Sequence, residues 1–162
     1  MKLTLNVGCG ERTYKEYPKG YKCINYDARD IPKHTDVIGD VRDLSFFDDE
    51  YFDYILASDI IEHFPISETP TILKEWRRAL KHNGVIEFRL PDLSAICRAY
   101  VNKQHDAKLT SWLLYGGQDY PGNFHFVGFD RQFLNSVVAP IGFEEIECKD
   151  SGNNFEIKFR KI

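Results

Sequence analysis

A series of short apolar segments, each followed by a glycine or a polar residue, constrains the fold of this chain more than any other feature. These segments predict strands at residues 3–7, 21–26, 38–41, 52–57 and 85–90. Helical patterns follow the later strands. Strands that alternate with helices favour a mostly parallel sheet with helices on both faces, in which ligands bind at the carboxyl ends of the strands.

Residues 67–83 are the clearest predicted helix, because their apolar side chains recur at helical spacing. Ser67 or Thr69 can cap the start of this helix, and Pro70 suits its first turn. Asn83-Gly84 is typical of the left-handed residue that stops a helix. We therefore expect the fifth strand to begin directly after Gly84.

The second half of the chain predicts two more helices and a terminal hairpin. One helix spans residues 92–101 and the other begins after Asp130, with an irregular stretch between them. Residues 143–148 and 155–160 flank a turn-rich segment at residues 149–154 and predict an antiparallel hairpin.

The composition predicts one globular domain over residues 1–162, with 43% apolar and 28% charged residues. Neither a secretion leader nor an apolar run of about 20 residues is present, so we expect a soluble cytoplasmic protein without membrane contact. The four cysteines lack ligand spacing and predict reduced thiols, with no disulfide and no metal. A net charge of -4 argues against a nucleic-acid partner, and the oligomeric state stays open.

A glycine turn and an acidic residue follow the first two predicted strands. Gly8 and Gly10 in the segment 6–10 allow a tight turn and close approach of a ligand, although an ordinary strand-ending turn has the same composition. Asp27 lies 19 positions after Gly8, the distance at which nucleoside-binding folds place a ribose-binding acid. The alternative is a solvent-facing carboxylate with Arg29 nearby.

The next two strand ends also carry polar side chains. Asp40 can accept the adenine amino group while Val41 packs on the ring, or it can belong to a surface turn. After the fourth strand, His63 is either a group of the acceptor site or a buried imidazole with satisfied hydrogen bonds. Asp59 and Glu62 have the spacing of a capping box, so Glu62 can instead serve to accept a hydrogen bond from a backbone N–H at the start of a helix.

These segments together resemble class I S-adenosylmethionine-dependent methyltransferases, and most closely a small branch of the type 11 methyltransferase domain. The resemblance covers about residues 3–90 and is carried by residues 5–10, 25–27, 39–44, 52–64 and 80–85. It implies S-adenosylmethionine as cofactor and a Rossmann-like, doubly wound α/β sheet of order 3-2-1-4-5-7-6. The seventh strand in that order is antiparallel, which agrees with the predicted hairpin.

The resemblance also implies which residues contact the cofactor. Gly8 and Gly10 approach its methionine and ribose portions, Asp27 its ribose, and Asp40 with Val41 its adenine. Ser58 and His63 line the cleft. The complete predicted cofactor-binding set is Asn6, Gly8, Cys9, Gly10, Asp27, Ala28, Asp40, Val41, Arg42, Ser58, Asp59 and His63.

The chain departs from the family pattern after its glycine turn. The family's further glycine is replaced by Arg12 or Thr13, and residues 11–20 are too few for the usual first crossover helix. We expect that helix to be shortened or absent, with a helical turn or an ordered loop in its place.

Residues 105–130 form a predicted acceptor lid, because they combine aromatic residues with glycines. The alternative is a long connector whose aromatic side chains cover the core. If the acceptor must lose a proton, His125 or His63 is the predicted catalytic base, with Tyr115 or Asp119 as orienting group.

The acidity of the chain favours a small-molecule or sugar-type methyl acceptor. Two other functions remain open. A non-catalytic module that binds S-adenosylmethionine would keep the same pocket. A nicotinamide-dependent oxidoreductase is disfavoured, because Thr13 replaces the last glycine of that fingerprint.

Overall fold

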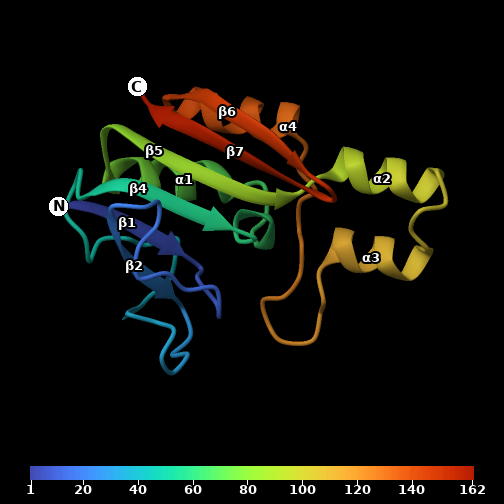
Figure 1. Cartoon of the computed structure of the whole chain (residues 1–162), viewed down its shortest axis with the longest axis horizontal. Coiled ribbons are helices and arrows are strands. Elements are labelled where there is room, and N and C mark those ends of the chain that lie inside the picture. Colours follow the sequence, from blue (N-terminus) through green and yellow to red (C-terminus); the bar gives the residue numbers. More distant parts are fainter.

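The protein is built on a seven-stranded sheet of order β3-β2-β1-β4-β5-β7-β6, in a computed structural model that describes residues 1–162. The strands are β1 (Lys2–Val7), β2 (Tyr21–Asp27), β3 (Val37–Ile38), β4 (Phe52–Ser58), β5 (Leu80–Pro91), β6 (Phe143–Ser151) and β7 (Asn154–Lys161). β7 is antiparallel to both β5 and β6, and all other neighbours are parallel. The predicted fold class, strand order and terminal hairpin are confirmed (Figure 1).

The main hydrophobic core lies between one face of the sheet and the helices α1 (Thr69–Ala79) and α4 (Arg131–Val138). Alternate residues of the central strands, such as Leu5 and Ile55, belong to this core. Trp76 of α1 is fully buried, and its Nε1 donates a hydrogen bond of 2.7 Å to the carbonyl of Val41. The helix therefore also holds the residues that follow β3.

The opposite face of the central strands is covered by residues 11–20, which contain no helix. The hydroxyls of Tyr17 and Tyr54 both donate to the buried carboxylate of Glu87 on β5. Thr4 of β1 donates to the backbone carbonyl of Tyr17. This face is thus closed by aromatic rings and hydrogen bonds. The prediction that the first crossover helix is shortened or absent is confirmed, and an ordered loop takes its place.

Helix α1 is shorter than predicted at its C-terminal end. It stops at Ala79, and Leu80 is extended and pairs with Phe52 of β4. Asn83 is in the left-handed conformation with φ 61°, but it lies within β5 beyond the helix end. Pairing of Leu80 with β4 therefore ends the helix, and the Asn83-Gly84 signal acts inside the strand.

The start of α1 and the third strand also differ from expectation. Glu68 precedes α1 without a capping side-chain bond, so neither Ser67 nor Thr69 has the predicted role. β3 covers only Val37–Ile38, because the chain turns where the carbonyl of Asp40 accepts a hydrogen bond of 2.9 Å from the Asp43 N–H. This turn directs the residues after β3 toward the cleft.

Two helices, α2 (Leu93–Val101) and α3 (Ala107–Tyr115), pack against each other beyond the carboxyl ends of β4 and β5 (Figure 1). α2 was predicted, but α3 lies in the stretch expected to be irregular. Asp106 caps α3 through a bond of 2.8 Å from the Leu109 N–H. Thr110 is its only buried residue, so α3 lacks the one-sided apolar pattern that predicts a helix.

The terminal hairpin has a tighter turn than predicted. Ser151 pairs with Asn154, so only Gly152 and Asn153 connect β6 to β7. No helix of the structure has the length and apolar character that crossing a bilayer would require.

Candidate active site

A cavity of about 900 Å³ opens at the carboxyl ends of β1, β2 and β4. It lies between β1 and β4, where the chain connections leave in opposite directions and open α/β sheets place their ligands. All predicted cofactor-binding residues except Asn6 line this cavity, namely Gly8, Cys9, Gly10, Asp27, Ala28, Asp40, Val41, Arg42, Ser58, Asp59 and His63. Strand ends far apart in the sequence therefore share one cleft.

The turn after β1 requires glycine at position 8. Gly8 has φ 63°, in the region that side chains other than glycine rarely adopt. A Cβ atom at this position would also lie 2.5 Å from Cδ1 of Ile60. The backbone can therefore turn beneath the cavity only without a side chain at this position.

Asp27, at the end of β2, is tied to this glycine turn. Its Oδ2 accepts a hydrogen bond of 2.8 Å from the Gly10 N–H, and its Oδ1 accepts bonds of 2.9 and 3.0 Å from the backbone N–H and Nε of Arg29. Burial alone would raise the pKa of Asp27, but the bonds from Arg29 and Gly10 outweigh it and lower the pKa. Asp27 is therefore ionised. Its side chain is buried and paired with Arg29, so the alternative of a solvent-facing carboxylate is wrong.

Asp40 repeats this arrangement after β3. Its Oδ1 accepts bonds of 2.9 and 3.0 Å from the backbone N–H and Nε of Arg42, and these contacts lower the pKa of the carboxyl group. Asp40 is more exposed than Asp27, while Val41 beside it is buried. An anionic acceptor and an apolar surface thus adjoin each other on the cavity wall.

Asn6 lies beneath the cavity and does not line it. Its Nδ2 donates to the carbonyl of Arg12 at 2.8 Å and to Oδ1 of Asn25 at 3.1 Å. The Arg12 side chain lines the cavity, and its Nη1 lies 2.6 Å from Oδ2 of Asp59. Asn6 therefore positions the segment after the glycine turn, which in this chain replaces a helix.

His63 and His125 meet on the cavity wall from different parts of the chain. Their ring centroids are 4.8 Å apart, with the planes at 82°. Nδ1 of His63 lies 3.1 Å from the carbonyl oxygen of Phe124, and Nδ1 of His125 lies 3.1 Å from that of Leu113. Burial lowers the pKa of both imidazoles, and proximity to His125 adds to the fall at His63.

Glu62, next to His63, is buried to 1% exposure, and neither of its carboxylate oxygens has a hydrogen-bond partner. The short 3-10 helix η1 (Ile61–His63) has no side-chain cap, so Glu62 does not form the capping box with Asp59. Burial raises the pKa of Glu62 to about 8; the charge of Asp59 adds to the rise, and nearby backbone N–H groups oppose it. A carboxylate without a partner in such a position needs a functional explanation.

The predicted lid forms the other wall of the cavity through α3 and the loop after it. Trp112, Tyr120 and His125 line the cavity from this segment. Tyr115 and Asp119 do not; the Tyr115 side chain is exposed, and Asp119 accepts a bond of 2.5 Å from Asn123. The structure therefore brings the two predicted histidines together but not the two predicted orienting groups.

Arg12 lines the cavity but is in no predicted site, whereas Trp112 and Tyr120 lie in the predicted lid without a predicted role of their own. Arg29 was considered only as a neighbour of Asp27. Arg42 belongs to the predicted set, and the equal spacing of Asp27 with Arg29 and of Asp40 with Arg42 is the signal that could have indicated Arg29 as well. Trp112 had no such signal, because its helix was not predicted.

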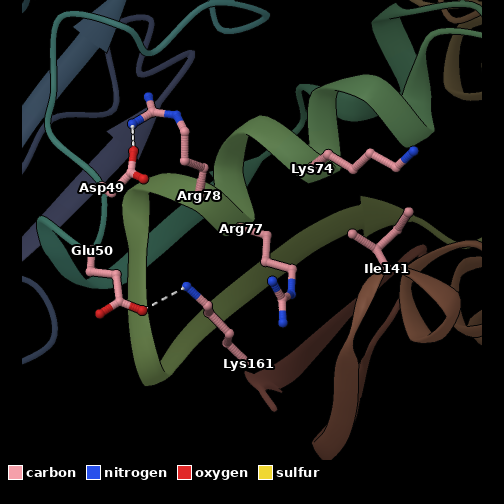
Figure 2. A pocket seen from close by; sticks show the side chains of 7 residues that line it. All are labelled: Asp49, Glu50, Lys74, Arg77, Arg78, Ile141 and Lys161. Carbon is pink, nitrogen blue, oxygen red and sulfur yellow. Dashed lines mark hydrogen bonds and ion pairs between the residues drawn. The ribbon is translucent and has the colours of Figure 1, made fainter.

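A second hollow, of about 540 Å³, lies away from this cavity among charged residues of α1 and the C-terminal end of the chain. Figure 2 shows Arg78 directed at Asp49 and Lys161 directed at Glu50, with N···O distances of 2.6 and 3.3 Å. Arg77 donates to the backbone carbonyl of Ile162 at 2.8 Å. The cationic side chains of this hollow are thus engaged in contacts within the fold. The first cavity is therefore the candidate active site.

Comparison with known proteins agrees with this geometry. The sequence profile of the methyltransferase domain matches residues 5–88. No curated protein sequence matches the chain.

Solved structures share the fold over nearly the whole chain. An S-adenosylmethionine-dependent methyltransferase from Methanosarcina mazei has a TM-score of 0.70 at 20% identity, over 99% of this chain and 92% of its own. A protein from Pyrococcus horikoshii OT3 has a TM-score of 0.73 at 22% identity, over 99% and 82%. The 1,6-didemethyltoxoflavin-N1-methyltransferase from Burkholderia thailandensis, solved with 1,6-didemethyltoxoflavin and S-adenosylhomocysteine, has a TM-score of 0.69 at 14% identity, over 98% and 70%.

Proposed function

This chain belongs to the methyltransferase-domain family and is a class I S-adenosylmethionine-dependent methyltransferase, and we propose that its methyl acceptor is a small molecule or a sugar. The observation that carries the proposal is the cavity of about 900 Å³ at the strand ends, which is at the upper end of the usual range for small-molecule sites. Such a cavity has room for an acceptor beside the cofactor. The net charge of -4 disfavours a long phosphate backbone as acceptor.

Within this cavity we place the cofactor along the three strand ends. Gly8, Cys9 and Gly10 take the methionine end, Asp27 the ribose, and Asp40 with Val41 the adenine. A carboxylate offers about four acceptor sites, and Asp27 uses one for Gly10 and three for Arg29, the longest of these a bond of 3.5 Å from Nη2. A ribose hydroxyl would therefore take the place of a bond from the Arg29 side chain.

The remaining cavity wall is the proposed acceptor side. Residues 105–130 act as the lid, and they contact the facing cavity wall at two points. The guanidinium of Arg29 lies 5.0 Å from the ring centroid of Tyr120, and Nδ1 of His63 lies 3.1 Å from the Phe124 carbonyl oxygen. A lid held at these points would exclude water from the reacting atoms.

Methyl transfer itself depends mainly on positioning. A lone pair of the acceptor atom forms a bond to the methyl carbon while the carbon–sulfur bond breaks. The electron pair of the broken bond stays on sulfur, and S-adenosylhomocysteine forms. Holding the acceptor atom in line with that bond can supply about 7 to 11 kcal/mol of the barrier. The cavity walls therefore carry most of the proposed catalysis.

His63 and His125 are the proposed acceptor-side groups. An imidazole can take a proton from a hydroxyl or an amine directly, or it can bind a metal ion that acts on the acceptor. The carboxylate of Glu62 beside the two rings favours the second role, which is developed below. Tyr115 and Asp119 are not part of the proposed machinery, because neither lines the cavity.

We also place the protein in the cytoplasm. Its four cysteines are all free, which fits a reducing compartment.

Calorimetric titration with S-adenosylmethionine and with S-adenosylhomocysteine tests the cofactor placement, with NAD as control. We expect both sulfur compounds to bind and NAD not to bind. Binding followed by turnover in a screen of small-molecule and sugar acceptors would support the enzyme. Binding without turnover of any acceptor would favour a non-catalytic binding module, and binding of NAD alone would contradict the cofactor placement.

A further inference from the structure

We propose that Glu62, His63 and His125 bind a first-row divalent metal cation at the wall of the cavity. One possible ligand atom from each residue lies within 4.8 Å of the other two. Two histidines and one carboxylate are a ligand set that suits manganese, iron, cobalt or zinc. The proposal departs from the sequence-based expectation of no metal, because His125 lies far along the chain from Glu62 and His63.

The imidazoles are oriented as metal-binding imidazoles usually are. Each Nδ1 faces a backbone carbonyl oxygen at 3.1 Å, that of Phe124 for His63 and that of Leu113 for His125. Because a carbonyl oxygen can only accept, Nδ1 must carry the proton, which leaves the lone pair on Nε2. A backbone carbonyl that holds the other ring nitrogen is the common support of a metal-ligating histidine.

The carboxylate of Glu62 is the second, independent indication. It is 1% exposed, and both of its oxygens lack a hydrogen-bond partner. A buried carboxyl group without a partner stays neutral unless a cation pairs with it or a metal ion is coordinated by it. A cation between Glu62 and the two imidazoles would use the carboxylate oxygen and both Nε2 atoms at once.

The surrounding structure allows these ligands to close on an ion. Two donors each about 2.1 Å from one cation are at most about 4.2 Å apart, so a separation of 4.8 Å must shorten by at least about 0.6 Å. The segment carrying His125 is already joined to η1, because the Phe126 N–H donates to the Glu62 carbonyl at 2.8 Å. Small side-chain movements therefore suffice.

The site also has an open side. His63 and His125 line the cavity, whereas Glu62 lies behind them. Three protein ligands leave at least one position of the cation free, as in catalytic metal sites. That position faces the proposed acceptor side; only this placement beside the acceptor rests on the proposed function, and cation binding itself does not.

Metal titration of the chain without cofactor tests the site. The protein is treated with EDTA, dialysed, and titrated with MnCl2 and separately with ZnCl2 in a calorimeter. We expect one equivalent to bind. Glu62→Gln, His63→Ala and His125→Ala should each weaken binding by about tenfold or more. His82→Ala, at an exposed histidine outside the cavity, is the matched control and should leave the affinity unchanged.

The unfolding temperature of each variant shows whether a loss of metal binding comes from a loss of folding. Glu62→Gln preserves the size and polarity of the side chain, so the metal-free variant should unfold at about the same temperature as the parent. Added metal should raise the unfolding temperature of the parent and not that of the variant. Absence of metal binding, or equal affinity in the parent, Glu62→Gln and His125→Ala, would overturn the proposal.

The same protein separates this proposal from the proposed function. A chain that binds manganese or zinc through these residues but does not bind S-adenosylmethionine supports the metal site and contradicts the cofactor placement. A chain that binds S-adenosylmethionine but neither metal supports the cofactor placement and contradicts the metal site.

Discussion

Asp27 and Arg29 form an ion pair at the end of β2, with 3.0 Å between Oδ1 and Nε. The same carboxylate accepts the Gly10 N–H, so one side chain connects the end of the second strand to the glycine turn after the first. If the ribose binds here, Asp27→Ala removes charge-assisted bonds of about 1.5 to 3 kcal/mol and weakens S-adenosylmethionine binding about tenfold or more. Asp30→Ala, at an exposed carboxylate three residues on, is the control for calorimetry. Equal affinity in both variants would exclude the ribose contact.

Gly8→Ala should destabilise the protein and weaken cofactor binding. The new methyl group would meet Ile60 at 2.5 Å in a backbone conformation with φ 63°. Gly152→Ala is a matched control, because φ is 69° there and no atom lies within 4 Å of the new Cβ. Backbone strain of about 1 to 3 kcal/mol is common to both, so chemical unfolding should show a larger loss for Gly8→Ala. Equal losses would mean that Ile60 moves aside without cost.

Tyr54→Phe should lower the free energy of unfolding by about 1 to 3 kcal/mol, because it removes a hydrogen bond to the buried Glu87 carboxylate. Tyr51→Phe, which alters an exposed tyrosine, should change it little. Denaturant unfolding of the two variants measures the difference. A neutral Tyr54→Phe would show that Tyr17 and Arg89 satisfy Glu87 without it.

The stability of the fold should fall in acid partly through Asp53. Burial alone would raise the pKa of this carboxyl group, but the Leu3 N–H and Lys81 outweigh it and lower the pKa. A group with a lowered folded-state pKa stabilises the fold above its unfolded value of about 3.9, and this contribution is lost as pH falls through the folded value. Asp53→Asn should therefore flatten the loss of stability below about pH 4. An unchanged slope in pH-dependent unfolding would contradict this assignment.

Closure of the lid should be visible in tryptophan fluorescence. Trp112 lines the cavity and is 58% exposed, whereas Trp76, the other of the two tryptophans, is fully buried. Addition of S-adenosylhomocysteine, with or without an acceptor, should shift the emission to shorter wavelength as Trp112 loses contact with water. Trp112→Phe should abolish the shift. A shift that persists in this variant would have to come from Trp76 and would count against the lid.

The sheet and the strand-end part of the cavity wall could be predicted from sequence because both depend on local patterns. Strand order followed from the resemblance, and the chemistry of Gly8, Asp27 and Asp40 follows from their positions at strand ends. Helix α3 could not be predicted in this way, because its apolar residues Leu109, Trp112 and Tyr115 are exposed and do not mark one face. The environment of Glu62 could not be predicted from sequence either. His125 comes beside it only through a loop more than 50 positions later in the chain.

Residues 11–20 link the stability of the sheet to occupancy of the cleft. Arg12 in this segment contacts Asp59 on the cavity wall, while Tyr17 covers the sheet and bonds to Glu87. Ten residues with no helical hydrogen bonds of their own therefore serve both a binding surface and a core. Local opening of this segment would expose both, so a bound nucleoside should slow amide hydrogen exchange not only at the glycine turn but also along β1 and β4, well away from the ligand.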